Sequence, residues 1–230
     1  TFRIASQPFD EYLDEPDASD ELVATLDDFD IALFNAGPAS SQAGLDLASE
    51  MIAKSPRISA SARVEEADAE RAHAVAATMM KLSQVANGEG NFRFCAAFNV
   101  PPGIPYFPAA YSDESVAGTF ALGCETSECV ALALRDIDRT SPNRLREASE
   151  RLTTVFEEMM VPLETLAKKI AEDKGFGYGG IDASIAPSPA ATSLVDSFER
   201  IIGRFGGAGT LAVCSMVTAS LKRIRRVKTC

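Results

Sequence analysis

The chain has 230 residues, 46% of them hydrophobic, and a formal net charge of −11 at pH 7. This length gives one large domain or two small ones with a substantial core, and the acidic balance argues against a nucleic-acid-binding protein. No run approaches the roughly 20 apolar residues of a membrane-spanning helix, and the first residues lack the pattern of a signal peptide. Residues 1–30 hold ten acidic residues against Arg3, so we expect an acidic N-terminal segment at 1–28 and a folded domain at 29–230.

The five cysteines include no C-x-x-C pair, and His73 is the single histidine. Because structural zinc sites need clustered cysteine and histidine ligands, we expect no metal site, and we expect no cofactor. Reduced thiols favour a cytoplasmic location, and the interior of an organelle is the alternative.

Hydrophobic periodicity predicts strands that alternate with helices along the chain. The predicted strands are residues 29–37, 57–64, 91–100, 115–123 and 178–185. The predicted helices are residues 40–55, 65–87, 142–174, 191–203 and 209–224. The order is typical of an α/β fold in which mainly parallel strands form a sheet or barrel with outer helices.

The longest predicted helix begins at Ser141–Pro142, is expected to kink at Pro162, and ends at Gly175. Its apolar stripe is Leu145, Ala148, Leu152, Val155, Phe156, Met159, Leu163, Leu166 and Ile170. A proline-rich loop is predicted at residues 101–111.

Three of the predicted strands combine an apolar face with a small, polar face, because side chains alternate across a strand. The apolar faces hold Ile58, Ala60, Ala62, Val64, Phe92, Phe94, Ala96, Phe98, Ile181, Ala183 and Ile185. The polar faces hold Arg57, Ser59, Ser61, Arg63, Arg93, Cys95, Ala97, Asn99, Asp182 and Ser184. A barrel explains this pattern, with the apolar faces against outer helices and the polar faces toward a lumen. The alternative is antiparallel strands with one solvated face.

In the barrel interpretation, Arg63 and Arg93 converge with Asp182 in the lumen. Buried arginines are costly unless paired, so their partner is either Asp182 or an anionic ligand held by the planar guanidinium groups. The candidate substrate-binding residues are Arg63, Arg93, Asn99, Tyr111, Asp182 and Ser184. Asp182 and Cys95 are the candidate catalytic residues, for a reaction that the sequence does not define.

Three stretches carry a resemblance to a known family: FRFCAAFNVPPGIPYFPAAY (92–111), GYGGIDASIAPSP (177–189) and GGAGTLAVCSMVTASLKRI (206–224). They resemble domain-of-unknown-function family 711, also called uncharacterised protein family 0210, over most of residues 29–224. The resemblance implies a fold similar to the pyruvate formate-lyase-like glycyl radical enzymes, a barrel of ten strands in two halves with helices outside. Family members are longer, so it also implies a barrel that is incomplete at the C-terminal end.

Glycyl radical chemistry is not expected for this chain. That chemistry needs a glycine in a C-terminal loop and a cysteine at a loop tip, whereas Cys95 falls within a predicted strand. Cys124, in GCETSEC, is only a weak candidate.

Two functions stay open at this point. The first is a small-molecule binding protein, or an enzyme of barrel descent, that holds an anionic ligand in the lumen. The second is a structural or assembly subunit that has lost catalytic activity, in which a second copy or another protein chain covers an open sheet edge. Neither function calls for nucleic acid or a membrane span.

Overall fold

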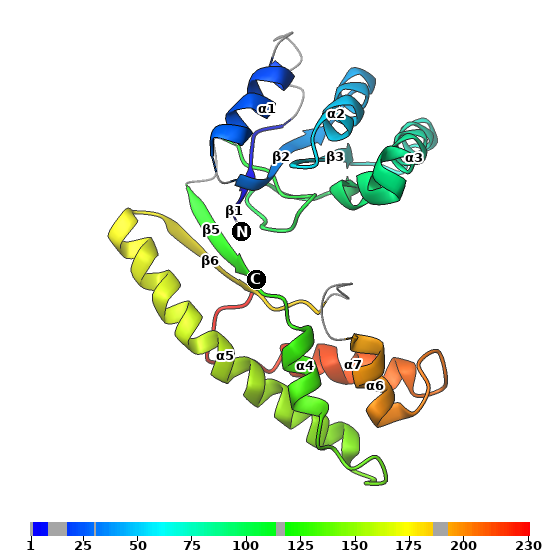
Figure 1. The fold of residues 1–230 in the computed structure, drawn as a ribbon, viewed down its shortest axis with the longest axis vertical. Helices are drawn as coiled ribbons and strands as arrows, with labels where there is room; N and C mark the ends of the chain where they lie inside the picture. Colours follow the sequence, from blue (N-terminus) through cyan, green and yellow to red (C-terminus); the bar gives the residue numbers. More distant parts are fainter. Residues whose placement is uncertain (1, 9–17, 30, 114–117, 186–192) are drawn as a thin grey trace. The chain divides into compact units, whose positions relative to one another are not determined.

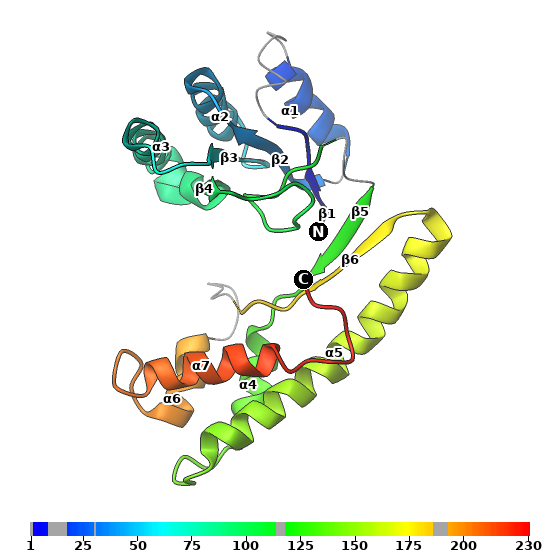
Figure 2. The same ribbon diagram turned by 180° about the vertical axis from the view of Figure 1, so that it is seen from behind.

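The computed structural model describes residues 2–8, 18–29, 31–113, 118–185 and 193–230, and the chain divides into unit 1, Thr1–Ala117, and unit 2, Gly118–Cys230. Both units contain parallel strands joined by helices (Figures 1 and 2). The mixed α/β class with parallel strands is therefore confirmed. The ten-stranded barrel stays a prediction, because the described residues form one sheet of four strands and another of two.

Unit 1 is built on a sheet with the order β1-β2-β3-β4, in which every neighbouring pair is parallel. Its elements are β1 (Phe2–Ala5), α1 (Ala18–Asp28), β2 (Ile31–Ala39), α2 (Gln42–Lys54), β3 (Ile58–Val64), α3 (Ala69–Leu82), a 3₁₀ segment (Val85–Arg93) and β4 (Phe94–Phe98). The antiparallel alternative is wrong for these strands. β1 and α1 lie within the segment predicted as an acidic tail, and β1 adds a strand to the sheet.

Local capping sets the helix ends in unit 1. Ser41 caps α2 and Asp68 caps α3, each by accepting a hydrogen bond from a first-turn N–H. The helix predicted at 65–87 is shorter, because α3 ends at Leu82. Ala86 and Asn87 follow with positive φ values of 47° and 56°, which a helix does not tolerate.

The helix-facing side of the sheet is the apolar face that the strand pattern predicts. Its core consists of Leu26, Ala36, Ala39, Leu45, Ala48, Met51, Ile52, Ile58, Ala60, Ala62, Val75, Leu82 and Phe94. Phe98, also expected on this face, has the same strand parity as Phe94 and lies beside Val64, but it is 57% exposed at the end of β4 and adds little to the core. Phe92 lies before β4 begins and is also exposed.

Unit 2 contains a sheet of two parallel strands and four helices. Its elements are β5 (Thr119–Gly123), α4 (Ser127–Leu134), α5 (Arg144–Lys174), β6 (Gly177–Asp182), α6 (Leu194–Ile202) and α7 (Thr210–Leu221). Thr229 forms a further parallel bridge with Ile181 of β6, which brings the last residues of the chain beside that strand. Its core consists of Val130, Ala133, Leu134, Ala148, Leu152, Phe156, Met160, Ile181, Ala183, Leu194, Phe198, Ile201, Val213, Met216, Val217, Ile224 and Val227.

Two carboxylates of α5 hold the backbone of the C-terminal residues. Glu157 Oε1 accepts hydrogen bonds from the N–H groups of Arg225, at 2.9 Å, and Arg226, at 3.3 Å. Glu164 Oε1 accepts the N–H of Lys228 at 2.6 Å. Charged acceptors make strong hydrogen bonds to backbone N–H groups, so these contacts fix the path of the chain toward β6.

The apolar stripe predicted for the long helix is buried only in part. α5 runs alongside β5 and β6 (Figure 1), and it continues through Pro162 without ending there. Phe156 is buried, whereas Leu163, Leu166 and Ile170 are 38%, 57% and 44% exposed. These three residues, named here the α5 stripe, lie at helical spacing on one flank of α5. Among the described helices, none is both long and apolar enough to cross a membrane.

Candidate functional site

The side of the unit 1 sheet opposite the helices carries polar side chains. Parallel register places Asn35 beside Ser59 and Ser61 beside Cys95, and Arg63 shares their parity on β3. We call these five residues the polar face. Asn35, Ser59 and Ser61 are fully buried although they are polar, so something other than solvent must cover them.

The cover is the segment of residues 100–113 that follows β4, named here the cover segment. It crosses on the side of the sheet opposite the helices, drawn in green (Figure 1). Asn35 Nδ2 donates a hydrogen bond to the carbonyl oxygen of Ala110. The N–H of Ser112 donates to the carbonyl oxygen of Ser6 at 2.8 Å. The predicted polar face is therefore an interior surface closed by the chain's own loop.

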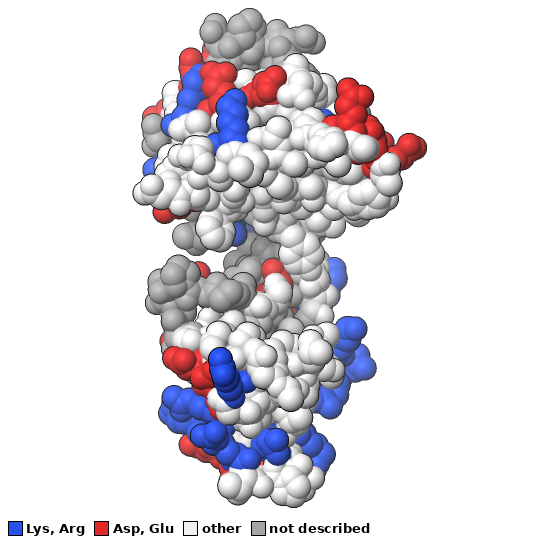
Figure 3. Space-filling view, turned by 90° about the vertical axis from the view of Figure 1, so that its right-hand side faces the viewer, with Lys and Arg blue, Asp and Glu red and all other residues white. Residues whose placement is uncertain are grey.

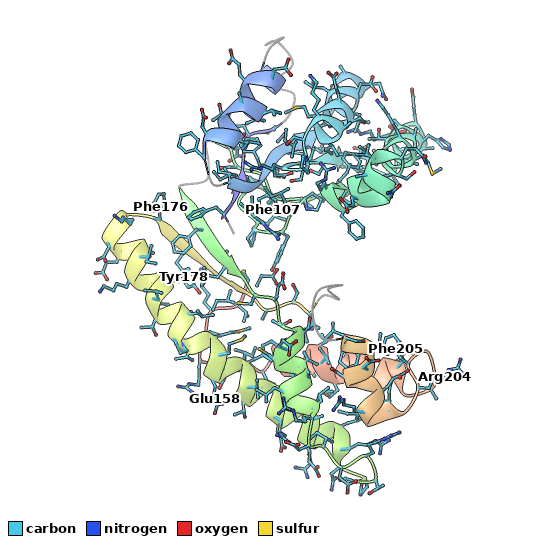
Figure 4. All side chains as sticks on the ribbon, in the orientation of Figure 1. Phe107, Glu158, Phe176, Tyr178, Arg204 and Phe205 are labelled. Atoms are coloured by element: carbon cyan, nitrogen blue, oxygen red, sulfur yellow. The ribbon has the colours of Figure 1, made fainter. Side chains whose placement is uncertain are left out.

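Two arginines lie over aromatic rings of the cover segment. The Arg63 guanidinium carbon is 5.4 Å from the centre of the Tyr111 ring, and that of Arg3 is 5.9 Å from the ring of Phe107, which Figure 4 labels. Cation–π contacts of this kind use the face of the guanidinium, so its N–H edge stays available to an anion. Glu65 Oε1 lies 3.9 Å from Arg63 Nε, beyond hydrogen-bond length.

Arg63 stands at the carboxyl end of β3, where parallel α/β sheets bind their ligands. A residue that the sequence did not single out, Arg71 of α3, braces this end. Its Nε donates to the carbonyl oxygen of Arg63 at 3.0 Å, and its other nitrogens donate to the carbonyl oxygens of Ala39 and Ser41. No sequence motif predicts this role of Arg71, because its three acceptors are backbone carbonyl oxygens of other segments of the chain.

Arg93 acts at the opposite end of the sheet. Its Nη1 donates to the carbonyl oxygens of Ile52, Ser55 and Ile58 at 2.8, 2.7 and 3.1 Å. Burial lowers the pKa of Arg93, a shift partly opposed by the charge of Glu89. The three carbonyl groups give Arg93 partners within the fold, and the expected convergence of Arg63 and Arg93 does not occur.

The remaining predicted residues of unit 1 lie near the carboxyl edge or on the polar face. Tyr111 is 6% exposed, and its hydroxyl donates to the carbonyl oxygen of Val100 at 3.1 Å. Asn99 directly follows β4 and has a positive φ of 51°. Burial raises the pKa of Cys95 to about 11, so its thiol is neutral at physiological pH and a poor nucleophile.

Asp182 and Ser184 belong to unit 2, where their side chains bond to each other while their carbonyl oxygens accept hydrogen bonds from Cys124 N and Thr126 Oγ1. Asp182 Oδ1 accepts hydrogen bonds from Ser184 N at 2.9 Å and Ser184 Oγ at 2.5 Å. This is the geometry of an aspartate turn at the end of a strand. The strand predicted at 178–185 accordingly ends at Asp182, and the binding roles of both residues stay predictions.

Within the part of the chain that the structure describes, no group of three or more histidine, cysteine, aspartate or glutamate side chains is arranged to hold a metal ion.

Comparison with known proteins relates the whole chain to one family. The family model described as Uncharacterised ACR (DUF711) matches residues 1–230. A UPF0210 protein of Methanopyrus kandleri is 24% identical over 225 residues, which cover 93% of this chain and 48% of that protein. A UPF0210 protein of Pyrobaculum arsenaticum is 26% identical over 138 residues, which cover 57% of this chain and 29% of that protein.

A third relative, the UPF0210 protein of Sulfurisphaera tokodaii, is 25% identical over 138 residues, covering 59% of this chain and 30% of the relative. The chain thus spans less than half the length of these relatives. The family resemblance noted in the motifs is confirmed, and the chain belongs to the family of uncharacterised proteins described as DUF711 and UPF0210.

Proposed function

We propose that unit 1 binds a small anionic molecule at the carboxyl edge of its sheet, as a binding protein or as an enzyme of barrel descent. The observation that carries the proposal is Arg63. Its guanidinium carbon lies over the Tyr111 ring at 5.4 Å from the ring centre, and no hydrogen bond engages its N–H groups among the described residues. A planar guanidinium with a free edge matches the paired oxygens of a carboxylate or phosphate.

The surroundings of Arg63 support an anion in three ways. Arg71 holds the backbone carbonyl group of Arg63 and so fixes the point from which its side chain extends. α2 begins at the same edge, directly after β2, and the amino end of a helix favours negative charge. The Cys95 thiol is neutral and adds no negative charge to that of Glu65, whose Oε1 lies 3.9 Å from Arg63 Nε.

Replacing Arg63 tests this proposal, with inorganic phosphate as the probe. In the wild-type protein we expect phosphate to raise the melting temperature above that in chloride at equal ionic strength, since a ligand at 100 times its Kd adds about 2.7 kcal/mol. Arg63→Gln should abolish the rise. Arg146→Gln is the matched control, because Arg146 forms only an exposed pair with Glu150 on α5. An equal rise in both variants would overturn the proposal.

A second function, an assembly subunit, is supported by the α5 stripe. Leu163, Leu166 and Ile170 are exposed on one flank of a 31-residue helix. Contiguous exposed apolar side chains commonly mark a protein–protein contact. In this alternative a second copy of the chain covers the stripe.

A further inference from the structure

Ser61 carries a buried hydroxyl with no hydrogen-bond partner in the described part of the chain. Its side chain has 0% exposure, and its Oγ makes no hydrogen bond with any described residue. Ser59, two positions earlier on the same face, is instead satisfied. Its hydroxyl contacts Asn35 Oδ1 at 2.9 Å and the carbonyl oxygen of Phe34 at 3.3 Å. Two serines on the same face of β3 therefore differ in hydrogen bonding, and the surroundings of Ser61 must explain the difference.

The two cross-strand neighbours of Ser61 make no hydrogen bond to its hydroxyl. Pro38 lies beside it on β2 and has no N–H group, and Cys95 lies beside it on β4 with only a weak thiol donor. Leaving a buried hydroxyl unpaired destabilises the fold, and buried polar groups nearly always find partners. An oxygen or nitrogen atom of a bound molecule would give the Ser61 hydroxyl the hydrogen-bond partner that it lacks among the described residues.

The side chain of Arg63 is the nearest charged group along the same strand face. Residues 61 and 63 are about 6–7 Å apart along β3, because each residue rises about 3.3 Å. We propose that Ser61 is the second contact of the ligand held by Arg63, and that this ligand carries a hydroxyl or carbonyl oxygen a few bonds from its anionic group. This inference rests on the proposed anion binding. Because Ser61 has 0% exposure, the ligand must displace part of the cover segment to reach it.

Two probes that differ only in their hydroxyl groups test the role of Ser61. Glycerol 3-phosphate and n-propyl phosphate share a phosphate and a three-carbon chain. We expect the wild-type protein to bind glycerol 3-phosphate about 3- to 10-fold more tightly, the range that one neutral hydrogen bond provides. Ser61→Ala should remove that preference while retaining the binding of n-propyl phosphate, as measured by isothermal titration calorimetry.

Stability without any probe supplies an independent readout. Ser61→Ala removes an unpaired hydroxyl, so the midpoint of urea unfolding should stay the same or rise. Ser59→Ala, the matched control, removes a satisfied hydroxyl and should lower the midpoint while keeping the preference for glycerol 3-phosphate. A variant that is more stable but less selective is not explained by a structural role alone.

The outcomes separate this inference from the proposed function. If the wild-type protein binds both probes equally and Arg63→Gln abolishes both, anion binding stands and the role of Ser61 is overturned. If Ser61→Ala keeps the preference for glycerol 3-phosphate, the role of Ser61 is overturned as well. The Ser61 hydroxyl would then pair with a buried water instead of the ligand. If Arg63→Gln leaves the binding of both probes unchanged, the proposed function itself fails.

Discussion

Burial of Cys95 has a consequence at alkaline pH. Its pKa is raised from the ordinary 9.0 to about 11, so the folded protein keeps a proton that the unfolded chain releases. The resulting stability is fully present below pH 9 and is lost as the pH rises from 9 through 11. Cys95→Ala should therefore make the free energy of unfolding fall less steeply over this range, as measured by urea titration at each pH.

Cys214 provides the control for that measurement, because it is an exposed cysteine on α7. Cys214→Ala should keep the wild-type slope between pH 9 and 11. Equal slopes in the two variants would contradict the assignment of the alkaline loss to Cys95.

The sequence predicts which side of a strand a residue occupies better than it predicts what the residue contacts. Parity correctly indicated that Ser59, Ser61 and Arg63 lie on one side of β3, where the two serines are buried. It did not predict that Arg93 would bind the carbonyl groups of Ile52, Ser55 and Ile58. An arginine side chain is long, and its backbone acceptors come from segments brought near only by the fold, so no sequence spacing reveals them.

At the scale of elements, the α5 stripe allows a direct test of association. If a second copy covers Leu163, Leu166 and Ile170, Leu166→Lys should raise the dissociation constant of the oligomer at least tenfold, because an apolar contact is replaced by a buried charge. Light scattering coupled to size-exclusion chromatography measures the change. Thr165→Lys adds the same charge at an exposed neighbouring position and should have a smaller effect. A wild-type protein that stays monomeric at all concentrations would contradict the assembly function.

The elements that the sequence predicted are those with a clear hydrophobic period and recognisable ends. β2, α2, β3, α6 and α7 fall in this group, with boundaries displaced by a few residues. α4 was missed, since SECVALAL is a short apolar run in which helix and strand cannot be told apart by periodicity. β1 was missed because its four residues precede a strongly acidic stretch.

At the scale of the whole chain, the described apolar residues form two clusters that share no member. Phe94→Ala in unit 1 should cost about 3–5 kcal/mol and lower the melting temperature of one calorimetric transition. Phe156→Ala should act in the same way on a second transition, that of unit 2. One transition that both substitutions shift by the same amount would show instead that the units unfold together.

The two units also differ in charge. Unit 1 contains 19 acidic and 7 basic residues, and unit 2 contains 14 and 15. Lys and Arg side chains gather on the face of unit 2 drawn in the lower half of Figure 3. An anion approaching Arg63 therefore meets net repulsion from unit 1, so its binding depends on short-range contacts rather than on long-range attraction.

The bridge between Ile181 and Thr229 bears on how the protein is made. β6 pairs with β5 on one side, and Thr229, its neighbour on the other side, follows α6 and α7 in the chain. The strands of unit 1, in contrast, pair in the order in which they are synthesised. A ribosome would release every strand of unit 1 before the last segment of unit 2 emerged. Unit 1 is then ready to fold during translation, whereas unit 2 must wait with one side of β6 unpaired, a state in which chaperones would be expected to bind.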